Sequence, residues 1–537
     1  MSTPAAPTTA AGLPELTGST KLLGTVALAL ATFMNVLDSS IANVSIPAIA
    51  GNLGVSPGQG TWVITSFGVA NAISVPLTGW LAQRFGAVRL FVTSVLLFVL
   101  SSWLCGMANS LEMLVAARVL QGLVAGPMMP LSQTLLMSSF TPAKAGSALA
   151  LWGMTTLVAP VVGPLLGGWI TDAIAWPWIF YINIPVGLLA AAVVWRIYQK
   201  RELPRRKLPI DHVGLALLVL WVGSLQLMLD KGKELDWFSS PLIVGLGLTA
   251  AIGFVVFVVW ELTDAHPVVD LRLFGRRNFA VGVVTVSIAY GLFFGNVVLV
   301  PLWLQQWMGY TAISAGMALA PVGVLAILLT PLSGRKVSVW DPRWMVTASF
   351  LMFAFVMALR AAFSTQSDLV QIMLPTFLQG AAMAFFFIPL TTLLMSGIAP
   401  ERIAAAAGLS NFMRTMAGAM GTSITTTLWA DRAALHHAHL AEGMVLGDAA
   451  LNQTLGGLGQ AGLSSAAAMA QIDRMIDQQA FTRAANDIFL ASSWLFVALI
   501  VLVWFARRPP RMAPAPPGGV GGGAGGGVGG GVGGGAH

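Results

Sequence analysis

Long apolar runs divide most of this chain, and each is about as long as a helix that crosses a membrane. A helix needs about 20 mostly apolar residues to span the hydrocarbon core of a bilayer. Hydrophobic residues make up 56% of the 537 residues and charged residues only 9%, whereas soluble domains carry about 25% charged residues. We therefore expect an all-α polytopic membrane protein with fourteen transmembrane helices, not a large soluble enzyme. The runs lie at about 22–47, 61–82, 88–108, 111–138, 145–171, 178–197, 211–230, 240–261, 278–305, 311–333, 343–363, 368–397, 403–430 and 486–506.

The placement of lysines and arginines explains the net charge of +7 and orients the chain. Cytoplasmic segments of membrane proteins collect Lys and Arg, which is the positive-inside rule. With the N-terminus inside, cytoplasmic segments hold twenty basic residues and the opposite side six, namely Lys231, Lys233, Arg360, Arg432, Arg474 and Arg483. We therefore expect both termini in the cytoplasm, the longest opposite-side loop at 431–485, and no nucleic-acid partner.

Two sequence matches at nearly the same spacing indicate an internal duplication. The stretch PLTG at 76–79 recurs as PLSG at 331–334, and the stretch at 120–137 recurs at 378–395. Repeated bundles with a substrate site between them are typical of secondary transporters, and the chain has no GxxxxGK[ST] loop for ATP. The predicted organisation is a cytoplasmic N-terminal tail at 1–20, a six-helix bundle at 21–200, two inserted transmembrane helices at 201–270, a second six-helix bundle at 271–510, and a disordered Gly-rich cytoplasmic tail at 511–537.

Asp38 is the one charged residue between Lys21 and Arg84, and it lies inside the first apolar run. A charge within a membrane span costs at least about 2.5–3.5 kcal/mol, so it indicates a function. At 1.5 Å per residue, Asp38 and Arg118 of the fourth run reach similar depths from opposite sides. An arginine favours the charged form of a neighbouring carboxyl group and burial favours the neutral form. We predict that this pair couples transport to protons; the alternative is a buried pair that only packs helices.

One face of the first run carries only small or polar side chains, so we expect it to face the bundle. At helical spacing these are Ala31, Asn35, Asp38, Ala42 and Ser45. Glu112 at the start of the fourth run is a further candidate for proton coupling. Asn109 three residues before it resembles a capping box, which would be a structural role.

Arg414 lies near the middle of the run at 403–430, on the same face as Asn411. A lone cation on a cavity wall suits an anionic substrate or a proton relay. The second-half position equivalent to Arg118 is Thr376, so the two halves differ. The residues that we place on the wall of the substrate cavity are Asn35, Gln121, Asn411 and Arg414.

Three glycine-containing motifs predict where the chain bends or packs closely. In GWLAQRFGAVRL at 79–90, Gly79 and Gly86 allow a tight turn, and Arg84 and Arg89 anchor it at the cytoplasmic face. RVLQG at 118–122 ends in Gly122. In APVVGPLLGGW at 159–169, glycines four residues apart allow close helix contact and prolines leave a hinge; these residues are Pro160, Gly163, Pro164 and Gly167.

These motifs, with FMNVLDSSIANVSIP at 33–47 and WIFYINIPVG at 178–187, resemble the major facilitator superfamily, and within it the fourteen-span drug:proton antiporters. The resemblance covers about residues 20–510. It implies a major facilitator fold of two six-helix halves plus two inserted central helices. It also implies a signature loop at 79–90, a proton-coupling motif at 118–122 and an antiporter motif at 159–169. In the signature loop, Gln83 stands where the family carries an acidic residue.

The resemblance further implies a function. The protein would be a proton-driven multidrug efflux transporter of the cell inner membrane that exports hydrophobic, often weakly acidic toxic compounds without a cofactor. Its partners would be a periplasmic membrane fusion protein, contacted by the loop at 431–485, and an outer-membrane channel. One alternative is a proton-coupled exporter or importer of a specific metabolite or fatty acid on the same fold.

A membrane-embedded enzyme is a second alternative, but no catalytic constellation accompanies the one histidine cluster of the sequence. The cluster lies in the loop at 431–485, where we expect a solvated surface instead of a metal site. It consists of His436, His437 and His439.

Overall fold

The computed structural model of the protein describes residues 16–508 except 56, 141–151, 154, 156–158, 160–161, 164–165, 172, 203–204, 206–208, 210, 338, 443–448 and 462. Every regular element among these residues is a helix. The predicted Gly-rich tail at 511–537 lies outside the described residues.

The first half of the chain folds into helices that proline residues divide at several points. Pro76 lies in the 3-10 turn η1 between α3 and α4, and Pro127 lies between α6 and α7. Between α7 and α9 some of the described residues are also helical, among them 166–171. The elements of this half are α1 (Gly18–Leu53), α2 (Pro57–Gly60), α3 (Trp62–Ser74), η1 (Val75–Leu77), α4 (Thr78–Phe85), α5 (Ala87–Gly106), α6 (Leu111–Ala125), α7 (Met128–Met137), α9 (Trp178–Tyr181), α10 (Asn183–Tyr198) and η3 (Gln199–Arg201).

Two inserted helices and the second half follow. The inserted pair is α11 (His212–Lys231) and α12 (Pro241–Thr263), joined through η4 (Trp237–Ser239). The elements of the second half are η5 (Leu271–Gly275), α13 (Arg277–Gln306), α14 (Ala312–Leu319), α15 (Val322–Lys336), α16 (Pro342–Arg360), α17 (Leu369–Met395), η6 (Pro400–Arg402), α18 (Ile403–Glu442), α19 (Ala449–Gln460) and α20 (Ser465–Trp504).

Within the described residues, twelve helical segments are long and apolar enough to cross a membrane. Of the expected spans that are not among them, 145–171 lies largely outside the described residues. The run at 403–430 is part of α18, whose 40 residues are more polar because they include Arg414 and a Ser/Thr-rich stretch. The all-α membrane architecture is confirmed, and the count of fourteen spans stays a prediction.

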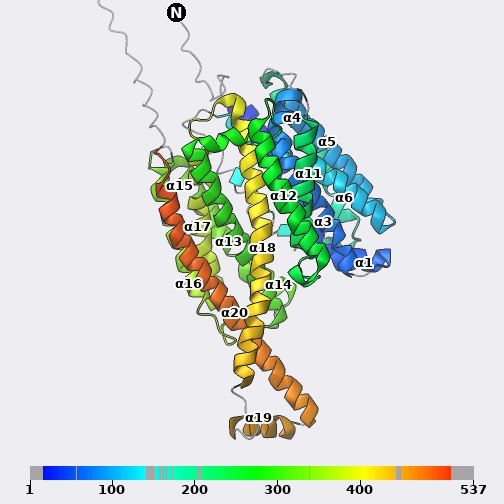
Figure 1. Ribbon diagram of the computed structural model, residues 1–537, viewed down its shortest axis with the longest axis vertical. Helices are drawn as coiled ribbons and strands as arrows, with labels where there is room; N and C mark the ends of the chain where they lie inside the picture. Colours follow the sequence, from blue (N-terminus) through cyan, green and yellow to red (C-terminus); the bar gives the residue numbers. More distant parts are fainter. Residues whose placement is uncertain are drawn as a thin grey trace, which may run out of the picture.

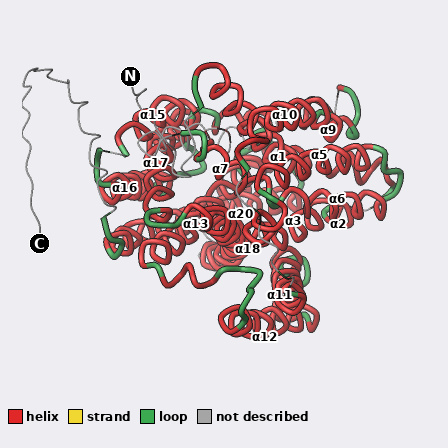
Figure 2. The backbone as a smooth tube through the Cα atoms, turned by 90° about the horizontal axis from the view of Figure 1, so that it is seen from above, coloured by secondary structure: helices red, strands yellow, loops and turns green. Residues whose placement is uncertain are grey.

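The two halves lie side by side, with α18 of the second half facing the first half and the inserted helices at the edge (Figures 1 and 2). In the first half, α3 packs against α6 and α10 packs against α1 and α5; in the second, α13 packs against α18 and α17 packs against α15 and α16. The inserted helix α11 contacts α3 and α18, so it touches both halves. The inserted pair therefore covers one side of the junction between the halves.

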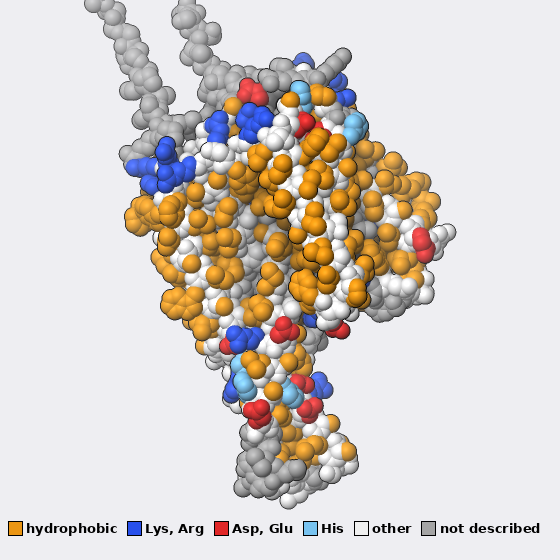
Figure 3. Space-filling view, viewed as in Figure 1, with side chains coloured by type: hydrophobic (Ala, Val, Ile, Leu, Met, Phe, Trp, Pro, Cys, Tyr) orange, Lys and Arg blue, Asp and Glu red, His pale blue; other side chains and the backbone are white. Residues whose placement is uncertain are grey.

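The surface separates into an apolar belt and one strongly basic end (Figure 3). We call the end that carries α4, η5, η6 and the end of α20 the basic end. Asp341, the N-cap of α16, lies here and is bonded to Arg343 at 2.8 Å, with Arg508 at 3.5 Å. Burial raises the pKa of Asp341, but the hydrogen bonds and charge of Arg343 and the charge of Arg508 outweigh burial and hold this pKa below its usual value. The remaining basic residues of this end include Arg272, Arg276, Arg277, Arg335, Lys336, Arg402 and Arg507.

The halves contact each other near the basic end. There α18 packs against α4, η1 and α7. A Cβ added to Gly79 of α4 would lie 2.6 Å from the Cα of Ala405, and one added to Gly408 would lie 3.2 Å from the carbonyl oxygen of Val75. The two glycines thus allow helix backbones of opposite halves to approach closely.

The described residues of the segment at 431–485 do not form a loop, as the sequence suggested, but a helical protrusion at the end opposite to the basic end (Figure 1). Here α18 and α20 extend beyond their apolar stretches, and α19 packs on α20. A small apolar cluster around Leu451, Ile472 and Ile476 holds the protrusion together. The Nε2 of His436 bonds to Asp487 at 2.8 Å, and the Nδ1 of His437 bonds to Asp477 at 2.8 Å. The hydropathy pattern did not predict these helical extensions, because it identifies the apolar residues that lie within the bilayer and not the polar residues by which a helix extends beyond it.

Candidate functional site

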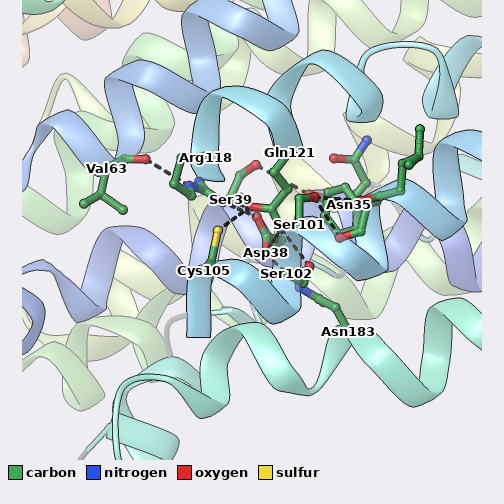
Figure 4. Close-up of polar contacts among 12 residues, drawn as sticks. Asn35, Asp38, Ser39, Val63, Ser101, Ser102, Cys105, Arg118, Gln121 and Asn183 are labelled. Carbon is green, nitrogen blue, oxygen red and sulfur yellow. Dashed lines mark hydrogen bonds and ion pairs between the residues drawn. The ribbon is translucent and has the colours of Figure 1, made fainter. Parts of the chain in front are cut away.

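Asp38 lies at the centre of a buried polar cluster that four helices of the first half build (Figure 4). Its Oδ2 accepts a hydrogen bond from the Nη1 of Arg118 at 2.6 Å. Its Oδ1 accepts from the Nε2 of Gln121 at 3.1 Å and from the Nδ2 of Asn183 at 2.8 Å. Ser102 accepts from the same two amides, at 2.8 and 3.3 Å. We call these five residues, from α1, α5, α6 and α10, the carboxylate node.

Arg118 is held by more than its ion pair. Its Nη1 also donates to the Oε1 of Gln121 at 2.6 Å, and its Nε donates to the carbonyl oxygen of Val63 at 2.9 Å. The guanidinium lies 4.2 Å from the ring centroid of Phe67. Asp38 and Arg118 are fully buried as side chains. In a membrane interior such a pair persists only with several fixed partners, because no water replaces them.

The pairing predicted from matching depths is found in the structure, and so is the inward-facing stripe of α1. Asn35, Ala42 and Ser45 are buried together with Asp38. Asn35 donates to the carbonyl oxygen of Ala125 at 3.3 Å. Gln121, which we placed on the substrate cavity, belongs to the carboxylate node. The part of these residues in proton coupling stays a prediction.

Glu112 lies apart from the node. It is exposed in the first turn of α6. The N-cap of this helix is Ser110, whose side chain accepts from the backbone N–H of Met113 at 3.3 Å, so the capping box expected at Asn109 is wrong. The structure does not bring Glu112 together with Asp38.

The second half carries two groups of related polar residues, and neither group includes a carboxylate among the described residues. Its Arg360, which we counted among the basic residues of the opposite side, is the last residue of α16 and is 2% exposed. The Nη2 of Arg360 donates to the Oε1 of Gln379 at 2.6 Å and to the Oγ1 of Thr376 at 3.2 Å. Asn296 donates to Ser492 at 3.0 Å.

A constant spacing relates these residues to the carboxylate node and was the signal that could have revealed Arg360. Four residues of the carboxylate node have counterparts 258 positions later: Asn296 for Asp38, Arg360 for Ser102, Thr376 for Arg118 and Gln379 for Gln121. The arginine has thus moved to a different helix, and a neutral amide replaces the carboxylate. Asn296 cannot take up a proton as Asp38 can.

Arg414 lies buried on α18 among aromatic rings. Its guanidinium is 5.1 Å from the ring centroid of Tyr290 and 4.9 Å from that of Phe387, and it donates to the Oδ1 of Asn411. Among the described residues no carboxylate forms an ion pair with it, and its Nε has no hydrogen-bond partner. The amide of Asn411 also reaches Gln133 of α7 in the first half, at 3.5 Å. Arg414 is therefore an uncompensated cation where the two halves meet.

Most glycines of the three motifs lie at close contacts between elements. Gly122 of α6 packs on the carbonyl oxygen of Phe67 in α3. Gly163 packs on Ser40 of α1, and a Cβ added to Gly167 would lie 3.1 Å from Ile41. Pro160 and Pro164 lie outside the described residues. In the signature loop Gly86 has a φ of 94°, Arg84 lies over Trp80 at 5.4 Å, and Arg89 is exposed.

A protein-family model described as Major Facilitator Superfamily matches residues 28–422. The chain belongs to the major facilitator superfamily. It is 51% identical to the multidrug export protein EmrB of Haemophilus influenzae, over 92% of this chain and 98% of that protein. It is also 51% identical to EmrB of Escherichia coli, over 92% and 97%, and 50% identical to the fatty acid resistance protein FarB of Neisseria gonorrhoeae, over 92% and 98%.

Solved structures of the superfamily share this fold at low sequence identity. The human organic anion transporter MFSD10 matches with a TM-score of 0.56 and 14% identity, over 90% of this chain and 99% of that one. The proton:xylose symporter XylE matches with a TM-score of 0.56 and 15% identity, over 90% and 96%. These matches show a major facilitator fold, as predicted.

The carboxylate node leads to a prediction about stability. Asp38→Asn leaves Arg118 buried without its counter-charge, and Arg118→Gln leaves Asp38 likewise, so each single change should lower the free energy of unfolding by about 3–5 kcal/mol. The double variant leaves no unpaired charge and should cost much less than the sum of the two. Thermal unfolding in detergent measures this. Glu234→Gln, which removes an exposed partner of Lys231, is the control and should change stability by less than about 0.5 kcal/mol. Additive losses in the double variant would contradict the coupling.

Proposed function

We propose that this protein is a proton-driven multidrug exporter that moves hydrophobic, often weakly acidic toxic compounds out of the cytoplasm. The observation that carries the proposal is the buried ion pair of Asp38 and Arg118, in a chain whose relatives are named multidrug export proteins. A titratable carboxyl group inside a membrane is a site for proton transfer. The basic end is the cytoplasmic end by the positive-inside rule, and the membrane is the cell inner membrane.

The coupling follows from charge balance. In the described state Asp38 neutralises Arg118, and both are out of reach of solvent. A proton that binds Asp38 removes the negative charge and weakens the bonds that join α1 to α6 and α10. The halves then rock about their junction, the proton leaves on the cytoplasmic side, and the carboxylate node forms again. The contacts of α18 with α4, η1 and α7 close the cytoplasmic side in the described state.

Arg414 supports an anionic substrate. A cation among Tyr290 and Phe387 with no carboxylate partner offers a negatively charged group both charge and aromatic surface. Such a site also fits the alternative function, export of fatty acids, because one relative is named a fatty acid resistance protein. The two functions share the same binding chemistry and differ in the range of substrates.

Transport in inverted membrane vesicles tests the coupling. An imposed pH gradient, acidic inside, should drive uptake of a lipophilic weak acid by the wild-type protein, and Asp38→Asn should abolish this uptake because the amide binds no proton. Binding of the same compound to the detergent-solubilised variant is the control for folding. Full gradient-driven uptake by Asp38→Asn would contradict the proposed role of this residue.

The charge of Arg414 should decide substrate type. Arg414→Gln should weaken binding of a carboxylate-bearing drug by about tenfold or more, a loss typical of a desolvated charge contact of 1.5–3 kcal/mol, and leave a neutral drug nearly unaffected. Arg414→Lys is the matched control, since it keeps the charge. Equal losses for both drugs in Arg414→Gln would show that Arg414 only supports the fold.

We further propose that the helical protrusion at 431–485 contacts a periplasmic membrane fusion protein of the EmrA type, which leads to a TolC-like outer-membrane channel. The protrusion stands away from the membrane belt and exposes Met469 and Met475 on α20. Charged substitutions at both methionines should abolish drug resistance in a Gram-negative host but leave uptake in inverted vesicles intact, because the vesicles need no partner. Loss of both activities would mean that the protrusion serves transport itself.

A further inference from the structure

The corner between α4 and α5 contains an acidic group that the signature loop itself does not supply. In the loop, Gln83 occupies the position where the family carries an acid. The carboxylate of Glu202 occupies the corner instead, although this residue lies more than a hundred positions further along the chain. Its Oε1 accepts from the backbone N–H of Val88 at 2.9 Å, and its Oε2 accepts from that of Arg89 at 3.2 Å.

These two N–H groups belong to the first turn of α5, where a helix has no internal acceptors. A negative charge at this end is also favoured by the helix dipole. Gly86 leaves the space for it, because a Cβ there would lie 2.5 Å from the Cδ and Oε1 of Glu202. Gly86 thus does two things: it adopts a positive φ and admits the carboxylate.

Glu202 lies on the segment that joins the first half to the inserted helices, and neighbouring residues tie this segment to the same region. The Nη2 of Arg201 donates to the carbonyl oxygen of Ser138 at 2.7 Å. The Nε1 of Trp80 in α4 donates to the carbonyl oxygen of Pro209 at 3.1 Å. Glu202 thus contacts α5 and Pro209 contacts α4, so two described residues of this segment hold the two sides of the corner.

The angle between α4 and α5 affects how the two halves contact each other. Gly79 of α4 is the residue that packs on Ala405 of α18 in the second half. Whatever orients α4 relative to α5 sets whether this contact forms. We propose that Glu202 supplies the acid missing from the signature loop and acts as a positioning residue that stabilises the state in which the halves are closed at the basic end. We call this contact of Glu202 with the first turn of α5 the latch. The role of the closed state in transport rests on the proposed function, whereas the latch itself does not.

The experiment measures the state of the basic end directly. Spin labels at Arg196→Cys and Trp340→Cys, both exposed and in opposite halves, report the distance across this end in detergent; the native Cys105 is buried. Glu202→Ala should shift the population from the short to the long distance by about tenfold, the order expected for a charge at a partly buried helix N-terminus. Glu202→Gln keeps one acceptor oxygen and should shift the population toward the long distance less than Glu202→Ala does.

Two further variants separate a latch from a general structural role. Gln83→Asp, which restores an acid within the loop, should return Glu202→Ala to the short distance and recover its transport. Lys200 is an exposed neighbour on the same segment, and Lys200→Ala should change neither the distance distribution nor the transport. An unchanged distance in Glu202→Ala would overturn the proposal even if transport fell. A shifted distance without recovery by Gln83→Asp would overturn the idea that Glu202 replaces the missing acid.

Glu202→Gln covers the case in which Glu202→Ala fails to fold. A folded Glu202→Gln variant with the wild-type distance distribution would also overturn the latch. Absence of pH-driven uptake by the wild-type protein would overturn the proposed function but not the latch, because the distances are measured without a gradient or a drug.

Discussion

The carboxylate of Asp38 lies in the part of a bilayer where water cannot solvate it, and most of the first half follows from that. Its two oxygens need donors, and the chain provides them from α6 and α10, with Ser102 of α5 holding the two amides in place. Helices that share one buried carboxylate cannot slide along or rotate about their axes without breaking its bonds. The small stripe on α1 and Gly122, Gly163 and Gly167 then become necessary, because they let neighbouring backbones come close enough.

The free-energy cost of burying a charge in the bilayer also explains why the two halves differ. In the second half Asn296 replaces the carboxylate, and an amide can remain buried with ordinary hydrogen bonds. Arg360 is bonded to neutral groups, Gln379 and Thr376, so its charge has no carboxylate partner among the described residues. A duplicated bundle has therefore kept the polar positions but placed the titratable group in one half. This arrangement suits a rocking transporter in which one half changes charge and the other serves as a fixed wall.

The sequence alone predicts those features that carry a large energetic cost. Asp38 and Arg118 stand out because charges within apolar runs are expensive, and their depths already pair them. Asn183 and Ser102 do not stand out, because neutral polar residues are tolerated in membrane helices and lie far away in the sequence. The burial of Arg360 was not predicted because this residue lies near the end of an apolar run, where a basic residue is ordinary. Glu202 escaped notice because a helix cap supplied from a distant segment leaves no local pattern, and the helices of the protrusion lack the apolar stretch that marks a span.

In the proposed mechanism, the cations of the two halves connect proton binding to substrate binding through the total buried charge. Arg118 is neutralised by Asp38, whereas Arg414 has no carboxylate partner among the described residues and lies where Asn411 approaches Gln133 across the junction. A weak acid that enters as its anion neutralises Arg414, and a proton that enters neutralises Asp38 and leaves Arg118 charged. Substrate and proton therefore change the buried charge in opposite directions, and occupancy by both at once restores the original balance. Counted over Asp38, Arg118 and Arg414, the net buried charge is zero when the anion is bound and two positive charges when the proton is bound, so exchange of one for the other moves the protein between two different states of buried charge.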